Sequence, residues 1–336
     1  MYYDYVSWNI QTTNDCFLKC DYCMTATSNL LKKKAQTTAV SKVLQLSKGM
    51  RRVNIVFIGG EPLMVGKDWF NEAYASMKAA PMETTSRVYT NGHLLDTEWV
   101  EMFRREKTQI VVSFDGLGNG AKGAQRGLDK IQEFAKDISA VSMTVSMSNY
   151  KGLIDCYKQV SAAGVKRFTV QFDIYADKDE AVLLGKETCK LFDYIEANPN
   201  GAKCSIYTDI KAMLSGKTQR FSVEFEPTVI NNDYCVNADG TITLGVPDCF
   251  DPEWQLGNIY ENDVSHVNDL LYHPTLRQVN RDFIESLNLI GELSKVNDVT
   301  RGGGFFFDKK GIMPMNRPNF PKLYLYRELF NHFGGL

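Results

Sequence analysis

The sequence predicts an α/β protein built on an open, partial barrel of six parallel strands, each followed by a helix. Short apolar segments of strand length alternate with segments of helical spacing through the first 200 residues, at a repeat of about 30 residues. Such alternation is typical of parallel strands joined by crossover helices. Six units are too few to close an eight-stranded barrel. We assign the barrel to residues 1–200 and a C-terminal extension with a capping segment to residues 201–336.

The first units are justified by the pattern of apolar residues. Residues 6–12 alternate and include a tryptophan and an isoleucine, which predicts a strand. Residues 35–48 have apolar residues at helical spacing, and residues 53–58 form a short, mostly apolar run that predicts a buried strand. Asp68 is expected to cap a helix over residues 68–80.

The later units follow from the same two patterns. Apolar runs that end at turn-forming residues predict strands, and apolar residues three and four positions apart predict helices. A glycine at position 164 is expected to close one of these helices. The expected strands cover residues 87–89, 109–114, 140–147 and 168–174, and the expected helices cover residues 96–106, 123–138, 151–163 and 180–197.

The composition indicates a globular protein and argues against two classes of partner. Of the 336 residues, 44% are hydrophobic and 23% are charged, and the formal net charge is −2. This charge balance gives no electrostatic reason to expect a nucleic-acid partner. The chain contains no apolar run of transmembrane length and no secretory signal at its start. We therefore predict a cytoplasmic protein without a membrane partner.

Three cysteines, Cys16, Cys20 and Cys23, lie within eight residues in the spacing Cys-x3-Cys-x2-Cys. Three thiolates can hold an iron–sulfur cubane and leave one iron without a protein ligand, as a reactive centre requires. A zinc site is an alternative, but no fourth cysteine lies nearby and the first histidine is His93. A disulfide fits an odd group of cysteines poorly in a chain without a secretory segment.

Three further motifs follow the second, third and fourth expected strands. They are Gly59-Gly60-Glu61-Pro62, Thr90-Asn91-Gly92 and Ser113-Phe114-Asp115-Gly116. Paired glycines permit close backbone approach and positive φ, and the proline stiffens the turn. In parallel βα architectures the active site lies at the carboxyl ends of the strands. We therefore expect these motifs and the cysteines to lie at one functional site.

The cysteine motif and the Gly-Gly-Glu-Pro segment together resemble the radical S-adenosylmethionine (SAM) superfamily. The resemblance implies a [4Fe-4S] cluster on Cys16, Cys20 and Cys23, with SAM on the open iron. The residues that it assigns to SAM binding share positions at or near the strand ends. Glu61 would hold the amino group, Ser113 the carboxylate or ribose, Arg126 the carboxylate, and Tyr22 the adenine; Gly59, Gly60, Pro62, Thr90, Asn91, Asp115 and Gln171 complete the set.

A second feature begins at Cys235, where Asp239-Gly240 separates two short strand-like runs and predicts a hairpin. With Cys249 and a following Gly-Asn-Ile, it resembles the SPASM or twitch extension, in which cysteines bind an auxiliary cluster. No cysteine follows Cys249, so we expect a degenerate hairpin without a cluster. Cys235 and Cys249 could instead complete a site with other ligands, donate hydrogen to a substrate radical, or be structural. Asp248 and Asp251 are candidate bases.

The resemblance implies an enzyme that cleaves SAM and abstracts hydrogen from a peptide or protein side chain, as peptide maturases and anaerobic sulfatase-maturating enzymes do. An amino acid, nucleoside or other small molecule is the alternative substrate, and a non-enzymatic cysteine-bound metal protein is a third possibility. A flavodoxin or ferredoxin is the expected electron donor. Only 15 residues precede Cys16, so a leader-binding domain is not expected. The Gly-rich segment 301–307 is interpreted as a lid, a barrel closure or a surface loop.

Overall fold

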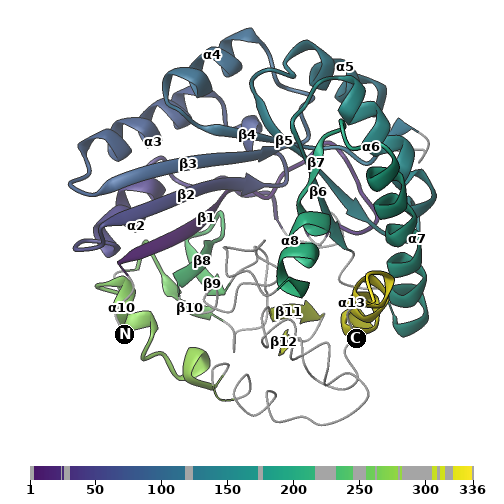
Figure 1. Ribbon diagram of the computed structural model, residues 1–336. Helices are drawn as coiled ribbons and strands as arrows, with labels where there is room; N and C mark the ends of the chain where they lie inside the picture. The colour runs from purple at the N-terminus through teal and green to yellow at the C-terminus, as the bar shows by residue number, and fades with distance from the viewer. Residues whose placement is uncertain are drawn as a thin grey trace. The chain divides into compact units, whose positions relative to one another are not determined.

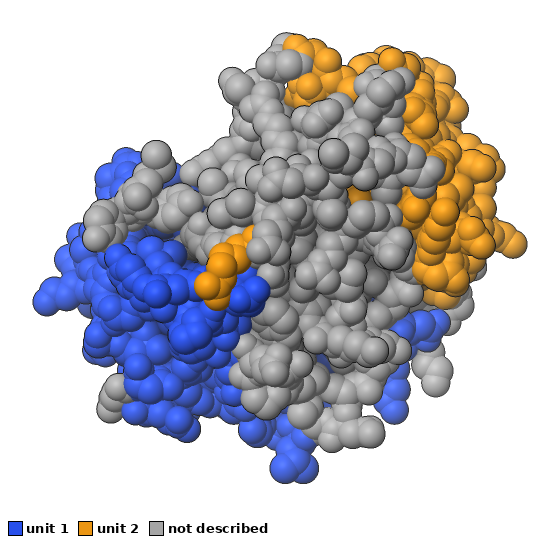
Figure 2. Space-filling model, turned by 90° about the horizontal axis from the view of Figure 1, so that it is seen from below, with its two compact units in different colours: residues 1–111, 228–279 blue, residues 112–227, 280–336 orange. Residues whose placement is uncertain are grey.

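The protein is described from a computed structural model, in which two compact units are distinguished (Figure 2). The first unit comprises residues 1–111 and 228–279, and the second comprises residues 112–227 and 280–336. The structure describes residues 4–23, 25, 31–117, 124–172, 177–215, 232–244, 255–261, 263–278, 281, 305–308, 311–314 and 321–334. The predicted domain boundary at residue 200 stays a prediction. Within these ranges no helix is both long enough and apolar enough to cross a membrane.

Three parallel strands form the centre of the first unit (Figure 1). They are β1 (Tyr5–Thr13), β2 (Arg52–Gly59) and β3 (Glu83–Thr90). The connections between and after them contain α2 (Ala39–Leu46), the 3-10 helix η1 (Pro62–Val65), α3 (Lys67–Ala79) and α4 (Thr97–Arg105). The carboxyl ends of all three strands therefore lie at the same edge of the sheet.

The two faces of β1 differ in chemistry, as its alternating sequence predicts. Trp8 is fully buried, and its indole N–H donates to Ser47 Oγ, beyond the end of α2, at 2.8 Å. On β2, Phe57 makes edge-on ring contacts with Trp69 and Tyr74 of α3. One face of these strands thus packs on the helices, which stabilises the fold by burying aromatic surface.

The predicted hairpin is present and pairs with the other edge of β1. It comprises β8 (Asp233–Val236) and β9 (Thr241–Leu244), which are antiparallel, and β10 (Gln255–Asn258) pairs with β9. Strand β8 runs parallel to β1. The turn is at Asp239-Gly240, where Gly240 has φ +91°, a conformation that favours glycine. A short helix, α10 (Val267–Leu270), follows.

The second unit repeats the parallel βα pattern. Strand β4 (Gln109–Ser113) begins in the first unit and ends in the second, where β5 (Ile138–Val145), β6 (Arg167–Phe172) and β7 (Lys203–Cys204) pair in parallel. The other elements of this unit are α5 (Ala124–Glu133), η3 (Tyr150–Gly152), α6 (Leu153–Ala162), α7 (Lys178–Ala197), α8 (Ser205–Leu214), β11 (Phe305–Asp308), β12 (Gly311–Pro314) and α13 (Pro321–His332). Part of the Gly-rich segment therefore belongs to a β-hairpin, β11–β12, and its residues 301–304 lie outside the described residues.

The six expected strands and their helices are all confirmed, with ends that differ by a few residues. One cap was wrong: α3 follows Gly66, and Asp68 lies within its first turn. Asp96 does cap α4 by accepting a hydrogen bond from Trp99 N, and Gly164 has the positive φ expected after α6. Strand β7 and helices α8 and α13 were not predicted, because their apolar positions are fixed by contacts with distant segments. Helix α13, for example, packs on α7.

Candidate functional site

The cysteine loop leaves β1 and rests directly on the glycines that end β2. Gly60 N donates to Thr13 O and Glu61 N donates to Asp15 O, both at 2.8 Å. A Cβ atom at residue 60 would lie 2.3 Å from Asp15 O, and one at Gly59 would lie 2.4 Å from Thr13 O. Neither glycine has positive φ. The paired glycines therefore permit a close approach of the backbone, and what they approach is the cysteine loop. The positive φ that we also considered for them is not present.

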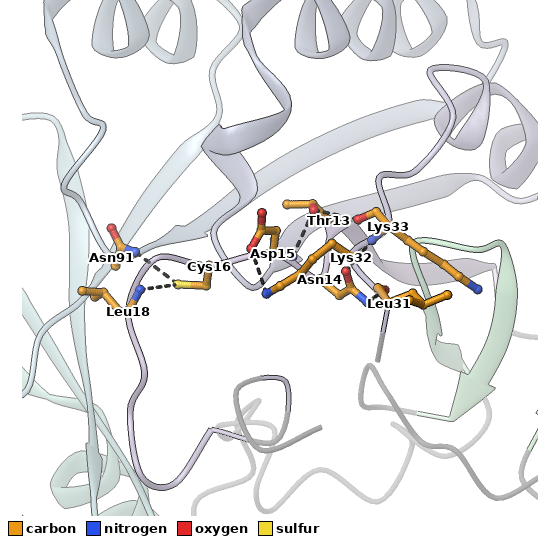
Figure 3. A network of polar contacts seen from close by, with 9 residues as sticks. All are labelled: Thr13, Asn14, Asp15, Cys16, Leu18, Leu31, Lys32, Lys33 and Asn91. Carbon is orange, nitrogen blue, oxygen red and sulfur yellow. Dashed lines mark hydrogen bonds and ion pairs between the residues drawn. The ribbon is translucent and has the colours of Figure 1, made fainter. Parts of the chain in front are cut away.

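The three cysteines of the loop are half-buried and form no disulfide. Cys23 N donates to Cys20 O at 3.1 Å, so these two residues share one tight turn. Cys16 Sγ accepts from Leu18 N at 3.3 Å and from Asn91 Nδ2 at 3.8 Å (Figure 3). Burial raises the pKa of the Cys16 thiol, and the charges of Glu61 and Cys23 add to this effect.

These residues fit an iron–sulfur cluster better than a single ion. The loop supplies three thiols, and two N–H groups donate to one of them, an arrangement that stabilises a negatively charged sulfur. Among the described residues, no three His, Cys, Asp or Glu side chains are already gathered closely enough to hold a metal ion. A cubane is larger than one ion, so its three thiolates lie farther apart than the ligands of zinc.

Glu61 is the most deeply buried acid next to this loop, with 0% of its surface exposed. Its Oε1 accepts from Leu63 N at 3.0 Å and from Thr90 Oγ1 at 2.7 Å, and its Oε2 accepts from Asn91 N at 2.8 Å. Burial raises the pKa of Glu61 to about 7, and these three donors limit the rise. The carboxyl group therefore joins the loop after β2 to the loop after β3. Its predicted contact with the SAM amino group stays a prediction.

The far end of the cysteine loop is closed by residues that the sequence did not single out. Asn14 Nδ2 donates to Leu31 O at 3.0 Å, and Lys33 N donates to Asn14 Oδ1 at 2.7 Å (Figure 3). Thr13 Oγ1 also donates to Lys33 O at 2.7 Å. The segment that leaves the loop is thus held against the end of β1. No local pattern predicts a pairing between residues this far apart in the sequence.

Two other residues near the loop are also new to the site. The Phe17 ring lies 5.5 Å from the ring of His93, which is buried and follows the Thr90-Asn91-Gly92 turn.

Two predicted residues also lie in or next to the loop. Tyr22, the predicted adenine contact, is half-buried in the loop itself. Pro62 begins η1 and is buried, as its role in stiffening the turn requires.

The remaining predicted SAM contacts belong to the second unit, and each stays a prediction. Ser113 ends β4 with an exposed side chain, and Asp115 follows it in a half-buried position. Arg126 is exposed in the first turn of α5, and Gln171 is exposed on β6.

The candidate residues of the hairpin region are only partly described. Cys235 lies on β8 with no exposed surface, opposite Asn9 of β1 in the parallel register. Asp248, Cys249 and Asp251 lie outside the described residues. Their predicted roles as hydrogen donor or base stay predictions, as does that of Cys235.

The family model described as "Radical SAM superfamily" matches residues 10–148 of the chain. A GTP 3',8-cyclase from Chlorobaculum tepidum is 28% identical over 145 residues, which are 43% of this chain and 43% of the relative. A serine-type anaerobic sulfatase-maturating enzyme from Klebsiella aerogenes is 28% identical over 109 residues, 30% of this chain and 27% of the relative. The matched segments thus span less than half of these relatives.

Solved structures resemble the chain over more of its length. "Native anSMEcpe with bound AdoMet and Cp18Cys peptide" has a TM-score of 0.75 at 17% identity, covering 98% of this chain and 96% of that one. Streptococcus suis SuiB bound to precursor peptide SuiA has a TM-score of 0.60 at 16% identity, covering 82% and 66%. Likeness at these identities concerns the fold, and it confirms the α/β partial-barrel class predicted from the sequence.

The buried position of Glu61 predicts a specific dependence of stability on pH. Its folded pKa of about 7 lies above the ordinary value of 4.5, so the folded state binds more protons between these values. The contribution of protonated Glu61 to the free energy of unfolding is complete below pH 4.5. It is lost as the pH rises through 7, a change of ~3 kcal/mol. We expect Glu61→Gln to remove this part of the slope, as measured by chemical unfolding at pH 5 and pH 8.

The exposed Glu72 of α3 provides the control, and Glu72→Gln should keep the wild-type slope. Glu61→Gln also places an amide N–H opposite Asn91 N, so it should be less stable than wild type at pH 5. Equal slopes in Glu61→Gln and wild type would show that Glu61 does not titrate in this range.

Proposed function

Because residues 10–148 are a radical SAM domain, whose cofactors are a [4Fe-4S] cluster and SAM, we propose that this enzyme abstracts hydrogen from a peptide or protein side chain. The observation that carries the proposal is the cysteine loop. The loop begins just beyond β1, and its first cysteine, Cys16, lies against Gly60 after β2 and beside Asn91 at the end of β3. Parallel βα folds place their reactive groups at this edge.

The chain's own residues would divide the work as follows. Cys16, Cys20 and Cys23 would bind three irons of the cluster and leave the fourth for SAM. When bound and reduced, the cluster supplies the electron that cleaves SAM to methionine and a 5′-deoxyadenosyl radical. Leu18 N and Asn91 Nδ2 stabilise negative charge on the Cys16 sulfur.

SAM itself would be held by groups at the strand ends. We propose that a carboxylate binds its amino group, that a guanidinium fork binds its carboxylate, and that an aromatic ring packs on its adenine. The residues proposed for these contacts are Glu61, Arg126 and Tyr22, with Ser113, Asp115, Gln171, Thr90, Asn91 and the Gly59-Gly60-Pro62 backbone around them. A flavodoxin or ferredoxin is the proposed source of the electron.

A peptide substrate is supported by the structures that share the fold, since two of them are described with a peptide bound. A small-molecule substrate is the second candidate. The 28% identity to a GTP 3',8-cyclase over 145 residues supports it, because the name of that relative describes an enzyme acting on a nucleotide.

Replacement of a cluster cysteine tests the proposed function. Cys20→Ala leaves two thiolates on the loop, so we expect the anaerobically reconstituted variant to lose the cluster absorbance and to form no 5′-deoxyadenosine from SAM. Cys189→Ala is the matched control, because Cys189 lies on α7 in a half-buried position and should not affect SAM cleavage. SAM cleavage at the wild-type rate by Cys20→Ala would refute the cluster assignment.

The substrate class can be separated by two parallel incubations of the reduced enzyme with SAM. One contains a mixture of synthetic peptides that together include every proteinogenic residue, and the other contains GTP. We expect 5′-deoxyadenosine to increase with the peptides and a peptide to change in mass, because the fold is shared with enzymes solved with peptides. Consumption of GTP with matching 5′-deoxyadenosine would assign a small-molecule substrate instead.

The iron content tests whether the hairpin carries a second cluster. We propose that it does not, since Cys235 is fully buried in the strand pair with β1 and two cysteines cannot hold a cubane alone. Reconstituted protein should contain about four irons per chain, and the double variant Cys235→Ala, Cys249→Ala should contain the same. About eight irons in wild type, halved in the double variant, would establish an auxiliary cluster.

A further inference from the structure

The segment that leaves the cysteine loop is held by the hairpin on its far side. Lys33 Nζ lies 3.1 Å from Asp239 Oδ2, in the hairpin turn, and Gln36 N donates at 3.0 Å to the hydroxyl of Tyr260, which lies two residues beyond β10 and packs on the hairpin turn. Lys33 is also the residue that pairs with Asn14 to close the loop. The hairpin therefore contacts the loop at its closing point and just beyond it.

The hairpin is anchored to the strand from which the loop begins. Ala238 N, in the turn, donates to Gln11 Oε1 of β1 at 3.0 Å. Below it, Asn9 Nδ2 donates to Asp233 Oδ1 at 2.6 Å, where burial raises the pKa of Asp233 to about 7. Both ends of the cysteine loop are thus connected to the sheet that contains β1 and β8.

Tyr260 is itself fixed by the hairpin turn. A Cβ atom at Gly240 would lie 2.3 Å from the Tyr260 ring, so the ring packs directly on the glycine backbone. Asn258 Nδ2 donates to Asp239 O at 3.2 Å, and Tyr260 N donates to Asn258 Oδ1 at 2.8 Å. The phenol is half-buried, and its hydroxyl accepts a backbone N–H at the approach to α2.

The segment that leaves the cysteine loop, here called the returning segment, is held by Lys33–Asp239 and by Gln36–Tyr260, and these two contacts differ in strength. The side chains of Lys33 and Asp239 are 48% and 39% exposed, and exposed ion pairs contribute little. The hydrogen bond between Tyr260 and Gln36 N is also exposed, but it is made by a side chain that its neighbours already hold in place, so little conformational entropy is lost in forming it. Tyr260 is therefore the main contact between the hairpin and the returning segment.

We propose that the hairpin braces the cysteine loop and that Tyr260 is a positioning residue for the cluster. This role would replace, in this chain, the binding of an auxiliary cluster that the resemblance assigns to such a hairpin. The inference rests on the proposed function only in taking the loop as the cluster site. Tyr260 acts on the loop through Gln36, which lies three residues beyond Lys33.

Tyr260→Phe removes the hydroxyl and keeps the ring on Gly240. We expect iron to leave the reconstituted variant about fivefold faster than wild type when a chelator is added, as the loss of one hydrogen bond implies. The change in the electron paramagnetic resonance spectrum on adding SAM should be weaker at subsaturating SAM. In the cluster-free protein, trypsin should cleave more rapidly after Lys19, in the cysteine loop, as followed by mass spectrometry.

Tyr272→Phe is the matched control, because Tyr272 is 58% exposed and packs near Arg277 instead of the hairpin turn. It should behave as wild type in all three measurements. Gly240→Ala, which forces the Tyr260 ring away, should reproduce the effect of Tyr260→Phe. Wild-type iron release and wild-type cleavage at Lys19 in Tyr260→Phe would overturn the brace, whereas a wild-type protein that binds no cluster would refute the proposed function itself.

Discussion

The carbonyl oxygen of Asp15 lies where a side chain on residue 60 would otherwise be, and the geometry of the site depends on this contact. Thr13 O and Asp15 O accept hydrogen bonds from Gly60 N and Glu61 N, so the edge of β2 continues into the cysteine loop. The direction of Cys16 is then set by backbone atoms rather than by flexible side chains. Any residue with a Cβ at position 60 would separate the two loops and move the first thiol.

Glu61 extends the same constraint from two strands to three. Its buried carboxyl group binds Thr90 and Asn91 at the end of β3, and Asn91 donates to the Cys16 sulfur. The Glu61 carboxyl group therefore has two effects on Cys16. It places a negative charge nearby, and by binding Asn91 N it helps to position the Asn91 side chain that donates to the Cys16 sulfur. Burial keeps the pKa of Glu61 near neutrality, so its negative charge is only partly present at neutral pH.

The sequence predicted the elements whose signals are local and missed the contacts that join distant residues. The six strands, their helices and the Asp239-Gly240 turn follow from periodicity and turn chemistry. The hydrogen bond between Lys33 N and Asn14 Oδ1 cannot be predicted in this way, because no motif in the sequence around either residue indicates it. The sequence motif indicated a ligand contact for Glu61, but not the hydrogen bonds that its carboxyl group accepts from Leu63 N, Thr90 Oγ1 and Asn91 N. A motif gives residue types, but the direction of a side chain depends on the packing of several loops.

The hairpin can support the cysteine loop through hydrogen bonds and ring packing alone. Gly257 has φ +138°, and a Cβ there would lie 2.5 Å from Val264 Cγ2, so glycine fits this point of β10, where the register with β9 shifts just before Asn258. Asn258 then binds the Asp239 carbonyl and holds Tyr260 on Gly240. The Gly-Asn-Ile sequence therefore has a mechanical function that needs no cysteine. Since these contacts end at Gln36, in the segment that leaves the cysteine loop, the proposed brace does not depend on whether the hairpin binds a cluster of its own.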